Sequence, residues 1–167
     1  MSPSDIEPAT GTLGVLTPGM GAVATTFYAG VIASRTGVAE PIGSLTQMGH
    51  IRLGKRTEDR NPKISELVPL TSLDDIVFGG WDPIPDNAYE AARRAGVLSP
   101  AHLEAMADEL KAIEPMTAVF SHDWVKLLEG ATHVKEGSST MDLAEQVIAD
   151  IERFRAENSC DRLVMVW

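Results

Sequence analysis

A short apolar run, a glycine-rich turn and a long stretch of small residues follow one another near the start of the chain. Residues 12–16 read TLGVL, and Thr17-Pro18-Gly19 comes directly after them. The next stretch, 22–33, is small and apolar, with no helix breaker before Gly30. This order predicts a buried strand, a tight turn and a helix that packs closely on a sheet.

Strand and helix patterns alternate along the rest of the chain. Strands that alternate with helices indicate βαβ units, so we predict an α/β fold with a Rossmann-like, doubly wound and mostly parallel sheet. We expect further strands at 73–81, 116–120 and 162–167, the last one apolar enough to be covered on both faces. We expect helices at 87–95, 100–113, 121–128 and 139–154.

Several helix ends carry recognisable signals. Asp86 is the expected N-cap of helix 87–95, and Gly96 is its expected C-terminal stop. Ser99-Pro100 provides a cap and a first-turn proline for the following helix. Ser139 and Asp142 resemble a capping box with Asp in place of the usual Glu.

The chain has the length of one domain. We interpret residues 1–11 as a flexible tail and residues 12–167 as a single domain that is incomplete at its C-terminus, since the sheet stops at its last strand. Periodicity fades between about 37 and 69, which we interpret as an insertion, hairpin-like in form. Its basic residues are most simply a solvated face, with a phosphate contact as the alternative; they are Arg52, Lys55, Arg56, Arg60 and Lys63.

Composition narrows the function classes. The formal net charge is −10, which argues against nucleic acid and anionic membranes as partners. No stretch has the length and apolarity of a membrane span, and no signal peptide is evident. Cys160 is the single cysteine, which fits a reducing cytoplasm. The four histidines are scattered, so we expect no metal site.

The turn after the first expected strand carries a nucleotide-binding pattern. Gly19, Gly21 and Ala24 have the G-x-G-x-x-G/A spacing, in which the second glycine lets a pyrophosphate approach the backbone. The phosphate would lie on the amides at the helix start, where the helix dipole favours an anion. A purely structural tight turn is the alternative.

A dinucleotide site of this type also needs an acid that binds the ribose, at the end of the second strand. Glu40 has about the usual sequence spacing from the glycines, but it follows no strand and precedes Pro41. Asp82 ends the next expected strand, and the insertion explains its greater distance along the chain. We therefore prefer Asp82, with an Asp that only caps the Pro83 turn as the alternative.

Three stretches of the chain resemble the inositol-3-phosphate synthase family, also called myo-inositol-1-phosphate synthase, in its bacterial form. They read GVLTPGMGAVATTFYAGV (14–31), PIGSLTQMGHIRLGKRT (41–57) and LDDIVFGGWDPIPDNAYEAA (73–92). The resemblance continues from about Thr12 to the last residue. It is more specific than any glycine spacing, because the runs are long and occur in this order.

The resemblance implies an NAD-dependent isomerase. Such an enzyme converts glucose 6-phosphate to inositol phosphate by oxidation at C5, enolisation, intramolecular aldol closure and reduction by the same cofactor. Carried over to this chain, the turn would hold the pyrophosphate and Asp82 the adenosine ribose. The implied cofactor-binding residues are Thr17, Gly19, Met20, Gly21, Ala22, Val23 and Asp82.

No catalytic residue is assigned in this chain. The resemblance implies that the catalytic lysines lie beyond residue 167, so we expect the chain alone to be inactive. We also expect the full-length protein to be a homo-oligomer. Two other interpretations stay open from the sequence. One is a piece of an ordinary NAD-linked dehydrogenase, and the other is a non-catalytic nucleotide-binding module.

Overall fold

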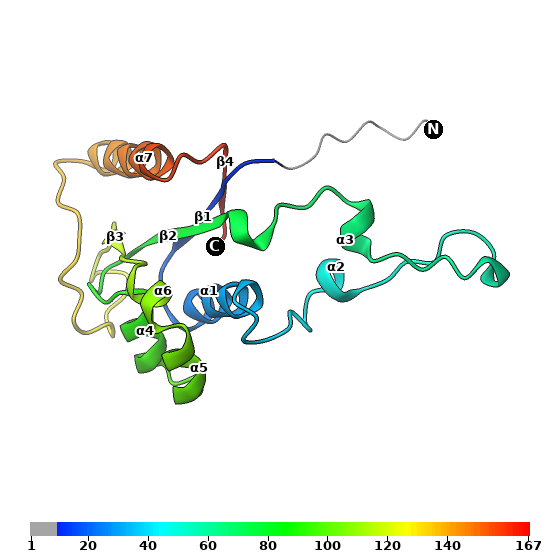
Figure 1. Cartoon of the computed structure of the whole chain (residues 1–167). Coiled ribbons are helices and arrows are strands. Elements are labelled where there is room, and N and C mark those ends of the chain that lie inside the picture. Colours follow the sequence, from blue (N-terminus) through cyan, green and yellow to red (C-terminus); the bar gives the residue numbers. More distant parts are fainter. Residues whose placement is uncertain (1–9) are drawn as a thin grey trace.

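Four parallel strands form the centre of the molecule. The computed structural model describes residues 10–167, so most of the expected tail, 1–11, lies outside the described residues. The strand order across the sheet is β3-β2-β1-β4 (Figure 1). The strands are β1 (Leu13–Pro18), β2 (Ile76–Asp82), β3 (Met116–Thr117) and β4 (Arg162–Met165).

Helices cover both faces of the sheet, so the predicted doubly wound α/β architecture is confirmed. One layer contains α1 (Ala22–Arg35), α4 (Ala88–Ala95), α5 (Pro100–Ala105) and α6 (Ala107–Lys111). The long helix α7 (Thr140–Glu157) lies alone on the opposite face (Figure 1). Every described strand pair is parallel, so the sheet is more regular than the mostly parallel one that the sequence predicts.

Alternate residues of β1 and β2 point into two separate cores. Val15 and Phe78 face the layer that contains α1, where the ring of Tyr28 stacks on Phe78 with centroids 4.6 Å apart. Leu16 and Trp81 belong to the core under α7. Side chains of a strand alternate between faces, so one pair of neighbouring strands supplies both cores.

Two glycines let α7 lie close to the sheet. A Cβ atom added at Gly79 would lie 2.5 Å from Cε2 of Phe154, and one added at Gly14 would lie 2.9 Å from Cε1 of the same ring. Such distances are shorter than carbon atoms tolerate in a packed interior. The phenyl ring of Phe154 therefore occupies the space above β1 and β2 that side chains would otherwise fill.

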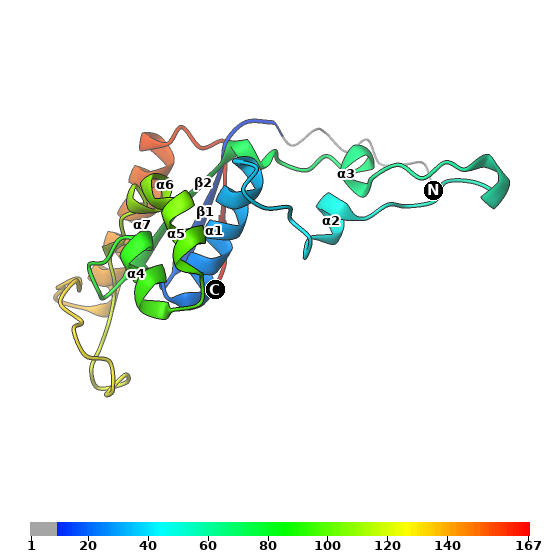
Figure 2. The same ribbon diagram turned by 60° about the horizontal axis from the view of Figure 1, so that its bottom comes forward.

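Residues 37–69 form an arm that projects from the body of the molecule (Figure 2). Two antiparallel bridges, His50 to Lys63 and Leu53 to Arg60, give its outer part a hairpin form. All five basic residues of this segment are exposed, as a solvated face requires. The arm contains the short helices α2 (Leu45–Met48) and α3 (Ile64–Leu67) and the 3-10 turn Arg56–Glu58, and a second 3-10 turn, Leu73–Asp75, leads into β2.

The signals at helix ends are mostly confirmed. Ser99 accepts a hydrogen bond from the His102 N–H at 3.2 Å, and Ser139 accepts one from the Asp142 N–H at 3.1 Å. Gly96 ends α4 in the left-handed conformation, with φ +66°. The prediction for Asp86 is wrong, because Asn87 is the N-cap and accepts from the Glu90 N–H at 2.9 Å.

Three other expectations need correction. The helix expected at 100–113 is divided at Met106, which has a non-helical backbone, although its apolar face is buried as predicted. Residues 121–128 form turns instead of a helix, and Trp124 and Leu127 are exposed there, so no apolar face stabilises a helix. Strand β4 is an edge strand with Val164 and Met165 exposed, so it is not covered on both faces as expected; Leu163, near its beginning, packs in the core under α7.

Candidate functional site

The turn between β1 and α1 depends on glycine at one position. Gly19 has φ +102°, a conformation that residues with a Cβ rarely adopt. Its N–H donates to the carbonyl oxygen of Trp81 at 2.7 Å. This bond extends the pairing of β1 with β2 by one residue, and the chain then reverses into α1.

Asp82 connects this turn to the end of β2. Its Oδ2 atom accepts a hydrogen bond from the Met20 N–H at 2.7 Å, and its Oδ1 atom accepts one from the Ile84 N–H at 2.9 Å. Each carboxylate oxygen has further lone pairs that can accept from a ligand hydroxyl. The carboxylate therefore fixes the turn and still has acceptor capacity at the carboxyl ends of the strands.

The start of α1 has polar backbone groups without helix partners. Thr25 is the first residue with an N–H bonded in α1, to the Gly21 carbonyl at 3.0 Å, so the N–H groups of Ala22, Val23 and Ala24 have no intrahelical acceptor. Within residues 10–167, no side chain caps this helix start, and its first turn contains no acid. These features suit a bound anion.

Neither the backbone conformation nor the packing within the protein requires a glycine at position 21. Its φ of −77° is open to any residue, and a Cβ built there would meet no atom within 4 Å. The residue is exposed at the surface of the turn. A side chain at this position would therefore project into open space next to the start of α1.

A cleft of about 290 Å³ joins the turn, the end of β2 and helix α4. It brings together predicted residues that are about 60 positions apart in the sequence. The lining residues are Met20, Gly21, Ala22, Asp82, Ile84, Asp86, Ala91, Arg94 and Ala95.

The other predicted site residues have different positions. The Thr17 side chain is buried, and its hydroxyl is hydrogen-bonded to the Tyr28 hydroxyl, so it points into the protein and away from the cleft. Val23 lies in the first turn of α1, and the residue is 87% exposed. Glu40, the alternative ribose acid, lines a separate groove beside the arm. The structure therefore favours Asp82 over Glu40 on position.

Tyr28 fixes α1 to the two strands that carry the site. Besides its contact with Thr17, its hydroxyl donates to the Gly79 carbonyl at 3.2 Å. Burial raises the pKa of Tyr28, so the hydroxyl stays protonated and remains a donor. Two hydrogen bonds of the Tyr28 hydroxyl thus join α1 to β1 and to β2 beneath the turn.

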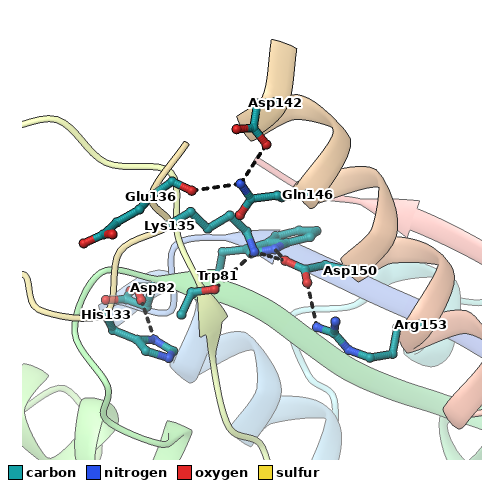
Figure 3. Close-up of polar contacts among 10 residues, drawn as sticks. Trp81, Asp82, His133, Lys135, Glu136, Asp142, Gln146, Asp150 and Arg153 are labelled. Atoms are coloured by element: carbon teal, nitrogen blue, oxygen red, sulfur yellow. Dashed lines mark hydrogen bonds and ion pairs between the residues drawn. The ribbon is translucent and has the colours of Figure 1, made fainter. Parts of the chain in front are cut away.

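A buried ionic cluster lies next to the site and has no signal in the sequence (Figure 3). The Lys135 ammonium is 2.7 Å from Oδ2 of Asp150, and both side chains are almost completely buried. Trp81 Nε1 donates to the same oxygen at 2.8 Å, and Arg153 donates to Oδ1 at 2.6 Å. Lys135 lies in an irregular segment, so no periodicity places it opposite α7.

The cluster holds Asp150 in its charged form. Burial alone would raise the pKa of Asp150, but hydrogen bonds from Lys135, Trp81 and Arg153 and the positive charge of Lys135 outweigh it, so the pKa is lowered. Trp81 bonds Asp150 through its indole and Gly19 through its carbonyl. The cluster therefore supports the strand end from which Asp82 reaches the turn.

His133 lies behind Asp82 (Figure 3). Its backbone N–H donates to the Pro83 carbonyl at 2.9 Å, and its ring Nδ1 is 3.2 Å from the Asp82 carbonyl oxygen. These contacts hold the segment after β2. Among residues 10–167, no group of three or more His, Cys, Asp or Glu side chains is arranged to hold a metal ion.

The lengths and apolarity of the helices can also be compared with what a membrane span requires. In the described part of the chain, no helix has both the length and the apolarity needed to cross a membrane.

A parallel sheet of order β3-β2-β1-β4, a glycine turn before an uncapped helix and an acid at the end of β2 together define a Rossmann-type dinucleotide-binding domain. A family model for the NAD-binding part of myo-inositol-1-phosphate synthase matches residues 13–167. The chain belongs to this family, and NAD is the cofactor that the model names.

Relatives from bacteria and plants agree with this assignment. The chain is 51% identical to inositol-3-phosphate synthase 1 of Bacteroides thetaiotaomicron over 164 residues, which cover 98% of the chain and 37% of the relative. It is 35% identical to a probable inositol 3-phosphate synthase isozyme 3 of Arabidopsis thaliana, covering 93% of the chain and 33% of that protein. The chain thus spans about a third of the length of these relatives.

A solved structure has the same fold. The crystal structure of inositol-3-phosphate synthase from Caenorhabditis elegans superimposes with a TM-score of 0.82 at 24% identity, covering 96% of this chain and 34% of that one. Membership of the synthase family favours a piece of a synthase over a piece of an ordinary NAD-linked dehydrogenase, one of the two interpretations that the sequence left open.

Proposed function

We propose that residues 12–167 are the NAD-binding unit of an inositol-3-phosphate synthase. The observation that carries this proposal is the hydrogen bond from the Met20 N–H to Asp82, which unites the glycine turn and the ribose acid at one cleft. The uncapped start of α1 and the open space at Gly21 suit a diphosphate. The residues present therefore fit the cofactor that the family model names.

Each proposed residue has a distinct part in binding. Gly19 permits the turn, and Gly21, Ala22 and Val23 offer backbone N–H groups and space to the diphosphate. Asp82 accepts from the ribose hydroxyls. Met20 and Thr17 stabilise the turn through contacts inside the protein, since the Met20 N–H is bonded to Asp82 and the Thr17 hydroxyl to Tyr28.

For the complete enzyme we propose the isomerisation of glucose 6-phosphate to 1D-myo-inositol 3-phosphate, in a homo-oligomer in the cytoplasm. NAD supplies the hydride acceptor and donor in this reaction. We assign no catalytic residue to this chain, since the two carboxylates of the cleft are already bonded, Asp82 to the Met20 and Ile84 N–H groups and Asp86 to Arg94. We therefore propose that the 167-residue chain binds NAD and does not turn over glucose 6-phosphate.

Calorimetric titration of the chain tests the binding proposal. We expect saturable binding of NAD and of AMP, which contains the adenosine and one phosphate, and much weaker binding of nicotinamide mononucleotide. A chain that is folded by circular dichroism but binds neither NAD nor AMP would contradict the proposal. Formation of inositol phosphate from glucose 6-phosphate by the chain alone would contradict its inactivity.

A further inference from the structure

The cleft continues past Asp82 toward helix α4. On this side its wall is formed by Ile84 and by Ala91 and Ala95 of α4, which are small or apolar. Asp82 lines the same cleft and accepts a hydrogen bond from the Met20 N–H, two residues before α1. A nucleotide with its diphosphate at α1 and its ribose at Asp82 would place its base against α4.

Arg94 is the residue with a positive charge among the described residues that line the cleft. It lies in the last turn of α4, and its side chain is 54% exposed. Its guanidinium forms an ion pair with Asp86, which lines the same cleft. This pair limits the orientations of the guanidinium on the α4 side of the cleft.

We propose that Arg94 binds the adenine ring of the cofactor, with its guanidinium plane stacked on the base and Asp86 fixing that plane. The inference rests on the proposed function and extends it to a residue with no assigned role. A guanidinium is planar, weakly hydrated and suited to stacking on aromatic rings. Ile84, Ala91 and Ala95 provide the apolar contact that the ring also needs.

The position of Arg94 favours the base over the diphosphate as its ligand. The diphosphate has its own donors at the start of α1. Arg94 lies on a different helix, in the last turn of α4, and its charge is already paired with Asp86. A flat face remains available to a neutral ring even while the edge of the guanidinium is bound to a carboxylate.

Arg93 offers a matched control. It is the neighbouring residue on α4, its side chain is 66% exposed, and its guanidinium is paired with Glu90. It does not line the cleft that contains Asp82. Replacing either arginine by Met removes one exposed positive charge from the same helical turn.

The experiment measures dissociation constants by calorimetry for the unaltered chain, Arg94→Met, Arg94→Lys and Arg93→Met, with NAD, AMP and inorganic pyrophosphate. We expect Arg94→Met to raise the dissociation constants of NAD and AMP by about three- to thirtyfold, the range of a cation–π contact. The dissociation constant of pyrophosphate should not change. Arg94→Lys keeps the charge but loses the planar guanidinium, so it should also weaken the binding of AMP. Arg93→Met should match the unaltered chain.

Two results would overturn the inference and leave the proposed function intact. The first is equal AMP affinity in Arg94→Met and Arg93→Met. The second is a loss of pyrophosphate affinity in Arg94→Met alone, which would assign Arg94 to the phosphates. A folded, unaltered chain that binds no nucleotide would instead overturn the proposed function, and this inference with it.

Discussion

The backbone N–H of Met20 donates a hydrogen bond of 2.7 Å to Oδ2 of Asp82, although the two residues are 62 positions apart in the sequence. The parallel pairing of β1 with β2 makes this contact possible, because it sets Pro18 beside Trp81. One carboxylate thereby shapes the glycine turn and lies where we propose that the ribose binds. Changes on either side of this bond should therefore affect NAD affinity.

Gly21→Val should weaken NAD binding and leave the fold intact. The valine side chain would fill the open space above the start of α1, so we expect the dissociation constant for NAD to rise by at least about tenfold. Gly30→Val is the matched control, since a Cβ there also meets no atom within 4 Å and Gly30 lies in the same helix away from the cleft. Calorimetry with both variants checks this prediction, and equal affinities would disprove it.

Asp82→Asn should weaken NAD by about ten- to a hundredfold, the value of hydrogen bonds to a charged acceptor. Asparagine keeps one oxygen that can accept from the turn. The free energy of unfolding should therefore change less than the free energy of NAD binding. Asp74→Asn has the same charge change at an exposed position near the opposite ends of the strands, and it should bind NAD as before. Similar losses in both variants would point to net charge as the cause.

Asp150→Asn should lower the free energy of unfolding by about 3 kcal/mol, because it leaves the Lys135 ammonium buried without its charged partner. Arg153→Met should cost less than about 1 kcal/mol, since that arginine is half exposed. Urea unfolding followed by circular dichroism gives both values. A smaller loss for Asp150→Asn than for Arg153→Met would contradict the importance of the buried pair.

The same carboxylate should make stability depend on pH in acid. The pKa of Asp150 is lower in the folded chain than in the unfolded chain, so its contribution is complete above the ordinary carboxyl pKa of about 4 and is lost as the pH falls through the lower, folded value. Unfolding free energies between pH 7 and pH 3 should fall less steeply for Asp150→Asn. Parallel curves for the two proteins would rule this out.

Gly79→Ala should destabilise the chain by about 1–3 kcal/mol, because the new methyl group would overlap the Phe154 ring. The double variant Gly79→Ala with Phe154→Ala should show almost no further loss beyond Phe154→Ala itself. Thermal unfolding of the four proteins in this cycle measures the coupling. Additive losses would mean that the ring and the glycine do not contact each other as described.

Local signals were enough to predict much of the fold from the sequence. The run before Gly19 and the small residues after it predicted β1 and α1, and Ser99 and Ser139 marked two helix starts. These signals act between residues that are near one another in the chain. Burial of an apolar face also decides whether a helix forms, and the exposed segment 121–128 lacks one.

The candidate site can be predicted from the sequence where strand ends and glycine spacing mark its residues. Asp82 was preferred over Glu40 because it ends a strand, and the structure places it at the turn. The partner of Asp86 and the contacts of Lys135 were not predictable, because they depend on how α4 and α7 lie against neighbouring segments. The buried Thr17 hydroxyl likewise depends on Tyr28, eleven residues away on α1.

The position of β1 between β2 and β4 also affects how the protein acquires its structure during synthesis. Thr12, just before β1, bonds Asp161, just before β4, across 149 residues. Strand β1, the first strand among the described residues, therefore has one edge unpaired until nearly the whole described chain has been made. Long-range pairing of this kind slows folding, and the exposed edge of β1 is where a chaperone would have most to protect.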